Sequence, residues 1–171
     1  MAGKRLDEIT QAAFVYGERS FDNYAQIRSA AEQLRDGFCA WLDNEQQCVF
    51  LVPPQGAFQA QNYRSMAFSV AGKGFLPLEP ISFGMAIKIS SEGDYMRLII
   101  TCRKEGSRMF LQVENRQSIE VKLPINDGSL EPVYEDLFSH LKSWFEDRVN
   151  QYDHGNYGTM DIGFDIQRVE D

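Results

Sequence analysis

Two histidines are the first residues to weigh for chemistry, and only one stands in a suggestive setting. His154 directly follows Asp153, and a carboxylate beside an imidazole is a pairing that acid–base catalysis uses. A simpler explanation is that a helix C-terminus, which we predict here, stabilises a cationic imidazole. His140 precedes a core position of the same predicted helix and is expected to border the core. We therefore assign no catalytic residue, and an enzyme using His154 with Asp153 is the least favoured function.

The cysteines and the acidic residues give no metal or cofactor site. The chain has three cysteines, Cys39, Cys48 and Cys102. Their odd number and the absence of a CxxC pair argue against a disulfide framework and against a zinc site built from cysteines. We interpret them as small buried or half-buried hydrophobic side chains. The acidic residues between 153 and 165 lack the spacing of an EF-hand loop, and the glycine–lysine turn at 71–74 lacks that of a phosphate-binding loop.

Charge and composition narrow the class of protein. The chain has 171 residues, with 17 Lys and Arg against 25 Asp and Glu, a net charge of −8. Residues 124–171 alone carry 3 basic and 11 acidic side chains. Such acidity argues against binding to nucleic acid or to an anionic membrane. A first segment without a secretory signal, and apolar runs far shorter than the ~20 residues of a membrane span, predict a cytoplasmic protein.

The clearest structural pattern is a two-residue alternation of apolar and polar side chains from 81 to 123. It predicts an antiparallel meander with strands at 81–90, 95–103, 108–114 and 117–123, apolar on one face. A long helix at about 130–152 follows, with a continuous apolar stripe that should pack on that face. Trp144 lies at the middle of this stripe. A final strand is predicted at 160–167.

The N-terminal half is expected to hold helices and further strands. Helical spacing predicts one helix over 6–16 that ends at Gly17 and another over 21–36 that ends at Gly37. Alternation then predicts a hairpin of strands 38–43 and 47–53, and a third strand at 64–70. The whole is a single α+β domain over 1–171. It has an antiparallel meander sheet of about seven strands, with an N-terminal helical segment and a long C-terminal helix packed on one face.

The polar face of the meander is the candidate surface for a ligand or partner. One interpretation is a solvated face on which arginines pair with Glu114 or Glu120 across strands. The other is a surface that receives an acidic protein or an anionic small molecule. The residues concerned are Lys88, Tyr95, Arg97, Arg103, Arg108, Phe110 and Lys122.

Two classes of function are favoured over an enzyme. The first is a non-enzymatic cytoplasmic accessory protein that acts by protein–protein contact, including a homodimer through the outer sheet face with Tyr95, Ile99 and Phe110. The second is a small-molecule-binding protein with a pocket between the sheet and the long helix. That pocket would be lined by Phe83, Met85, Leu98, Trp144 and Phe145.

Overall fold

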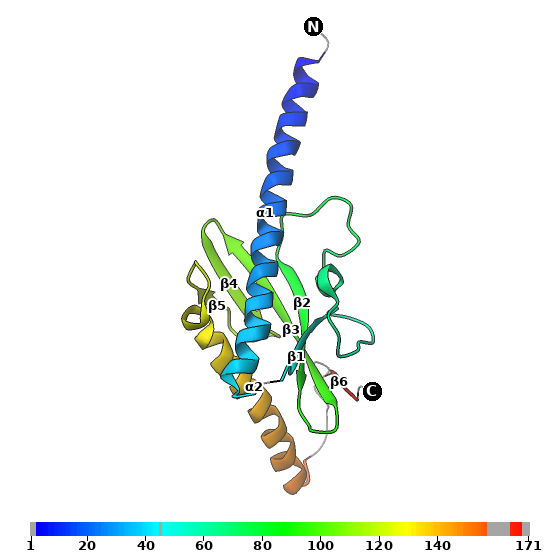
Figure 1. Ribbon diagram of the computed structural model, residues 1–171, viewed down its shortest axis with the longest axis vertical. Helices are drawn as coiled ribbons and strands as arrows, with labels where there is room; N and C mark the ends of the chain where they lie inside the picture. The colour runs from blue at the N-terminus through cyan, green and yellow to red at the C-terminus, as the bar shows by residue number, and fades with distance from the viewer. Residues whose placement is uncertain (1–2, 45, 157–164, 169–171) are drawn as a thin grey trace.

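The fold is an antiparallel sheet with two helices on one face (Figure 1), seen in a computed structural model that describes residues 3–44, 46–156 and 165–168. The chain begins with a 38-residue helix and places most of its strands before a second helix. The elements are α1 (Lys4–Trp41), β1 (Val49–Val52), η1 (Arg64–Ala67), β2 (Ile81–Lys88), β3 (Asp94–Glu105), β4 (Arg108–Val113), β5 (Ile119–Val121), α2 (Asp127–Asp153) and β6 (Asp165–Arg168). No helix within the described residues is both long and apolar enough to span a membrane.

The sheet has the order β1-β2-β3-β4-β5, and all neighbouring strands are antiparallel. β3 is long enough to have a different neighbour at each end. Its residues 100–105 pair with β4 and its residues 94–97 pair with β6. This confirms the predicted α+β meander, with six described strands instead of about seven.

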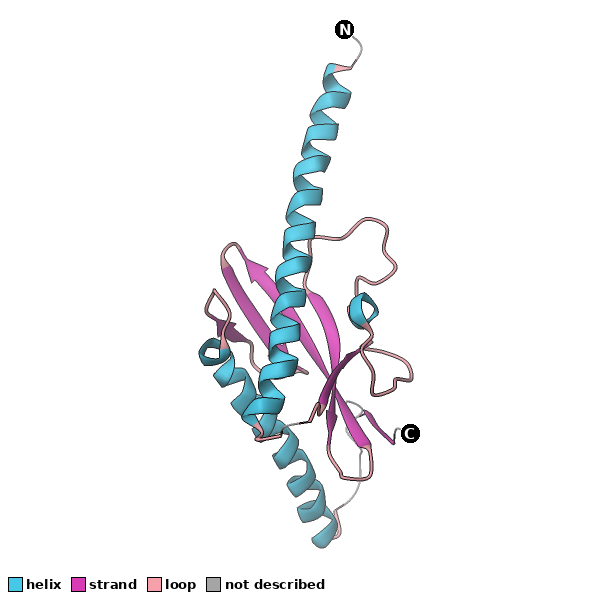
Figure 2. Ribbon diagram, in the orientation of Figure 1, coloured by secondary structure: helices cyan, strands magenta, loops and turns pink. Residues whose placement is uncertain are grey.

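The apolar face of the sheet and the two helices form the main core (Figure 2). Side chains that alternate along β2, β3 and β4 point to this face, as the sequence pattern predicted. The helices add apolar residues at three- and four-residue spacing. The fully buried members include Ile27, Leu34, Phe38, Phe83, Met85, Met96, Leu98, Ile100 and Leu137.

α1 is one continuous helix, so the prediction of two helices that end at Gly17 and Gly37 was wrong. A helix interior tolerates a glycine at a cost of about 1 kcal/mol, which a well-packed helix can offset. Gly37 has a packing reason to be glycine, because a Cβ built there would lie 1.9 Å from Tyr134 Oη of α2. The residue that suggested a helix end instead lets two helices approach closely.

The segments between α1 and β2 also differ from the prediction. Residues 38–41 are the last turn of α1, and β1 pairs with β2 instead of forming a hairpin with them. Alternation at Phe38, Ala40 and Leu42 fits a strand, but the spacing of Leu34, Phe38 and Trp41 fits a helix equally well. The third predicted strand, 64–70, is a short 3₁₀ helix followed by a single bridge to β2.

The fully buried residues of α2 all lie in its first half. Asn126 caps its start, and Leu130, Val133, Tyr134 and Leu137 are buried. Beyond them the apolar stripe leaves the sheet, so Val149 and Tyr152 are exposed. The expectation that the entire stripe packs on the sheet was therefore wrong. Of the predicted final strand, residues 165–167 lie in β6, and residues 160–164 lie outside the described residues.

Candidate interaction surface

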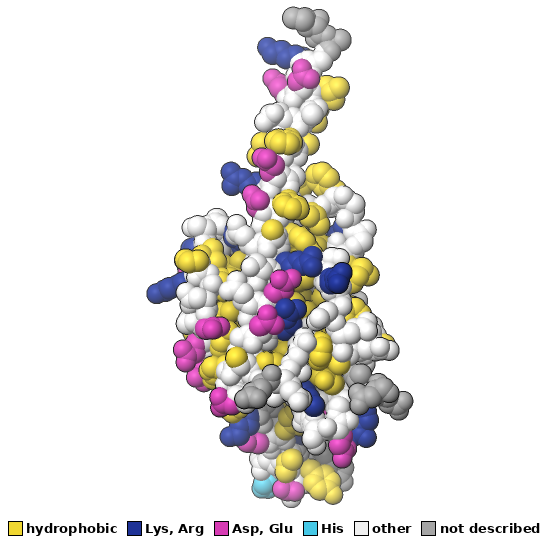
Figure 3. All heavy atoms as spheres, viewed as in Figure 1, with side chains coloured by type: hydrophobic (Ala, Val, Ile, Leu, Met, Phe, Trp, Pro, Cys, Tyr) yellow, Lys and Arg dark blue, Asp and Glu magenta, His cyan; other side chains and the backbone are white. Residues whose placement is uncertain are grey.

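Among the described helices and strands, the N-terminal half of α1 carries the largest number of exposed large apolar side chains. This half extends beyond the sheet and beyond α2, away from the core (Figure 1). Leu6, Ile9, Phe14 and Phe21 are each exposed over more than half of their surface. We call these four residues the apolar face of α1. Figure 3 shows hydrophobic side chains along this projecting part of the helix.

The distribution of charge around α1 makes this surface one-sided. At 100° per residue, the apolar face falls on one half of the helix together with Thr10, Ala13, Tyr16, Gly17 and Ser20. Every charged residue from 4 to 22 falls on the other half. The projecting helix is therefore amphipathic. The rest of the domain leaves its apolar side exposed from Leu6 to Tyr16.

A loop between η1 and β2 extends this surface at the base of the projecting helix. The ring of Phe75 stacks on that of Tyr16, with centroids 5.4 Å apart and planes 8° from parallel. The backbone N–H of Leu78 donates a hydrogen bond to Tyr16 Oη at 2.8 Å. Asn23 Nδ2 donates to the carbonyl of Glu79 at 3.4 Å. These contacts fix the loop against α1 and leave Phe75 and Leu78 exposed beside the apolar face.

Part of the outer sheet face, predicted as a ligand or partner surface, is covered by the protein's own chain. Tyr95 and Arg97 are buried there. Arg97 Nη1 donates to the carbonyls of Pro53 at 2.9 Å and of Gly56 at 2.7 Å, and its guanidinium lies 4.9 Å from the ring centre of Phe58. Arg97 thus holds the loop after β1 against the sheet, which is a structural role.

The other predicted residues of this face stay near the surface. The guanidinium groups of Arg103 and Arg108 lie 4.2 and 5.0 Å from the ring centre of Phe110. Arg108 also forms two hydrogen bonds of 2.9 Å with Glu120, which hold the pKa of that carboxyl below its usual value. The predicted pairing of an arginine with Glu120 is thus observed. Lys88 and Lys122 are exposed, and Lys88 lies opposite Tyr95 in the β2–β3 register.

The residues of the alternative pocket are divided between the core and its edge. Phe83, Met85 and Leu98 have no exposed surface and belong to the main core. Trp144 and Phe145 are half-buried at its edge, with ring centroids 5.0 Å apart. The first three side chains are therefore packed inside the domain, while the other two lie where α2 begins to leave it.

The histidines occupy two different positions on α2. His154 is the exposed C-cap residue, and its Nδ1 lies 2.8 Å from the carbonyl oxygen of Asn150. His140 is half-buried beside Arg116, which is bound to Asp136. Burial, and then the positive charge of Arg116, lower the pKa of His140. Within the described part of the chain, no group of three His, Cys, Asp or Glu side chains could hold a metal ion.

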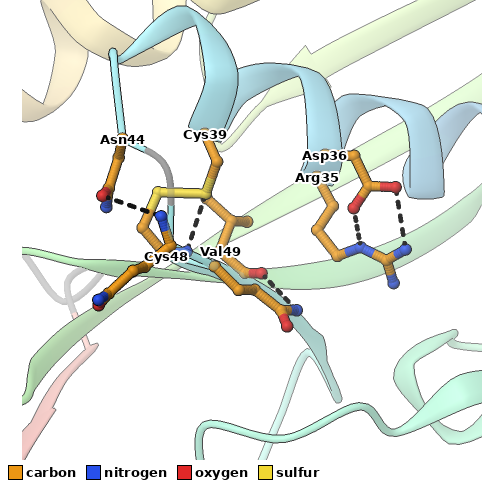
Figure 4. Close-up of a disulfide and its surroundings, with 8 residues drawn as sticks. Arg35, Asp36, Cys39, Asn44, Cys48 and Val49 are labelled. Carbon is orange, nitrogen blue, oxygen red and sulfur yellow. Dashed lines mark hydrogen bonds and ion pairs between the residues drawn. A yellow bond between two sulfur atoms is a disulfide. The ribbon is translucent and has the colours of Figure 1, made fainter.

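Two cysteines that were interpreted as unpaired hydrophobic residues form a disulfide (Figure 4). It joins Cys39, in the last turn of α1, to Cys48, just before β1. The expectation against disulfides was wrong here. α1 ends at Trp41, and the chain then turns back toward β1, which brings together two cysteines nine positions apart in the sequence. Cys102 is a buried free thiol, and burial raises its pKa to about 12.

Reducing this disulfide is expected to lower the free energy of unfolding by about 2 kcal/mol. The bond closes a short loop and so limits the freedom of the unfolded chain. Urea unfolding with and without dithiothreitol measures the effect, and a Cys39→Ser/Cys48→Ser variant is the control that reductant should not change. Equal midpoints for the oxidised and reduced wild-type protein would show that the bond adds no stability.

Comparisons of this chain with protein-family models, with curated proteins and with solved structures found no match.

Proposed function

We propose that this protein is a non-enzymatic accessory protein that acts by binding another protein chain, with the projecting half of α1 as its contact element. The observation that carries this proposal is the apolar face of α1. Its four large side chains lie exposed on a helix that extends away from its own core. Contiguous exposed apolar surface on a folded domain marks an interaction site more often than it marks chance.

The form of the surface favours a protein partner over other ligands. Amphipathic helices bind protein grooves and other helices through residues spaced three and four apart, as Leu6, Ile9, Ala13 and Tyr16 are. Nucleic acids and anionic membranes attract cationic surfaces, whereas residues 1–24 carry three basic and four acidic side chains. The contact therefore depends on apolar burial.

A cytoplasmic location remains part of the proposal and has a chemical consequence. The cytoplasm keeps most cysteines reduced, so Cys39 and Cys48 would be present there as two thiols. The apolar face of α1 lies far along the helix from Cys39 and does not depend on the bond. Binding through α1 should therefore be the same for the oxidised and the reduced protein.

Site-specific photocrosslinking tests the proposal. A photoreactive benzoylphenylalanine at Leu6 lies on the apolar face, and the same residue at Glu8 lies about 160° away around the helix. In an extract of the cells that produce the protein, we expect light-dependent adducts from position 6 and few from position 8. Equal yields from both positions, or no adduct from position 6, would contradict the assignment of this face.

A further inference from the structure

We infer that the partner on the apolar face of α1 is a second copy of this chain, paired with it through antiparallel projecting helices. This inference rests on the proposed function and names the partner of the same surface. It differs from the homodimer expected from the sequence, which used the outer sheet face, where Tyr95 and Arg97 are buried by the protein's own loop.

The spacing of residues along α1 favours another helix as the occupant. Apolar residues follow alternating steps of three and four residues from Leu6 to Tyr16 and again from Ile27 to Leu34, with the buried polar residues Ser20 and Asn23 between the two runs. This spacing is the repeat of pairwise helix packing. The positions that face the core of the domain include Ile27, Ala30 and Leu34. The earlier positions Leu6 and Ile9 continue the same face into solvent. The projecting half therefore has the pattern of a packed helix without a packing partner in its own domain.

The exposed area is sufficient for a pair of identical surfaces. Phe14 and Phe75 are exposed by 58% and 63%, and a covered aromatic side chain buries ~150–250 Å², so together they offer about 180–300 Å². Leu6 and Ile9, exposed by 65% and 66%, add roughly 100 Å². Two copies offer about 560–800 Å² from these side chains. Tyr16, exposed by 37%, and the small residues between them bring the pair near the ~1,000 Å² that a specific interface needs.

Charge does not oppose self-association at this surface. The whole chain has a net charge of −8, but residues 1–24 contribute only −1 of it. The acidic excess lies in residues 124–171, and α2 extends from the opposite end of the molecule (Figure 1). Two copies joined through the tips of α1 therefore keep their most acidic parts far apart.

The position of the domain selects the antiparallel orientation. The body of the domain and the loop with Phe75 both lie at the C-terminal end of the projecting segment. Parallel helices would bring the two bodies side by side, whereas antiparallel helices place them at opposite ends of the pair. In the register in which Leu6 of one copy faces Tyr16 of the other and Ile9 faces Ala13, the tip of each helix lies beside the Phe75 ring that stacks on Tyr16 of the other copy. Such a contact is two-fold symmetric and closed.

Measurement of the molar mass tests the pairing on the full chain. Sedimentation equilibrium at micromolar concentration should give a dimer of twice 19.6 kDa. Ile9→Asp should raise the dimer dissociation constant by about 100-fold or more, because the pair would bury two unpaired carboxylates. Gln11→Asp is the matched control, since it adds the same charge on the opposite side of the helix. Circular dichroism should show both variants folded, as both positions are exposed.

Cysteine crosslinking tests the orientation. An Ile9→Cys/Ala13→Cys variant should form interchain disulfides in the antiparallel pair, whereas the single Ile9→Cys variant should form few. Efficient crosslinking of the single variant would indicate parallel helices and overturn the arrangement. A wild-type mass of 19.6 kDa at tens of micromolar, or equal weakening by Ile9→Asp and Gln11→Asp, would overturn the self-pairing. A monomer that still crosslinks to a different protein from position 6 would leave the proposed function intact.

Discussion

Phe38→Ala is expected to lower the free energy of unfolding by about 3–5 kcal/mol, a large share of the ~5–15 kcal/mol of a typical domain. Phe38 has no exposed surface and lies between the two helices and the sheet. Its ring is stacked near those of Trp41 and Tyr134, with centroids 6.0 and 5.9 Å away. Removing the ring leaves a cavity that these rigid neighbours fill only in part. Urea unfolding followed by circular dichroism measures the loss.

Trp144→Ala is the comparison that locates the core. From the sequence, Trp144 was expected to be the shielded centre of the apolar stripe of α2. It is half-buried instead, and the fully packed part of α2 lies two turns earlier at Leu137. Its removal should therefore cost about 1–2 kcal/mol. A loss from Trp144→Ala as large as that from Phe38→Ala would show that α2 is docked along its entire length.

The strands β2 to β5 could be predicted because their environment is simple. One face of the sheet is covered by helices and the other is more polar, so a two-residue alternation records both the strand and its inner face. The end of α1 could not be predicted in this way, although the strand predicted at 47–53 contains β1. Phe38, Ala40 and Leu42 satisfy a strand pattern over too short a stretch to exclude a helix, and the choice depends on contacts with α2 that are distant in sequence.

The candidate surface shows a second limit of sequence reasoning. Helical spacing at Leu6 and Ile9 identified which side of the helix is apolar, but periodicity does not say whether anything covers that side. The prediction of an open outer sheet face was wrong in part for the opposite reason, because a segment of the chain covers it. Tyr95 and Arg97 occupy outward positions of β3, yet a loop from β1 folds back over them. In both cases the missing information is the path of a segment far away in the chain.

Gly37→Ala is expected to destabilise the protein by about 2–3 kcal/mol, although alanine normally favours a helix over glycine. The new Cβ would lie 1.9 Å from Tyr134 Oη and 2.9 Å from its Cζ, so one helix must shift. Tyr134 is itself buried and hydrogen-bonded to Asp127 at 3.4 Å, which limits its movement. Urea midpoints at one fixed protein concentration give the change, since self-association would make stability depend on concentration.

Gly17→Ala provides the matched control on the same helix. Nothing lies within 4 Å of a Cβ built at Gly17, so alanine there should raise the stability by about 0.5–1 kcal/mol. Tyr134→Phe removes the oxygen nearest to the Cβ at position 37, and it should therefore recover part of the loss in a Gly37→Ala/Tyr134→Phe variant. If the two changes simply add, or if both glycine substitutions are stabilising, the close approach of α1 and α2 at Gly37 is wrong. An additive result would also remove the physical reason for a glycine near the end of a continuous α1.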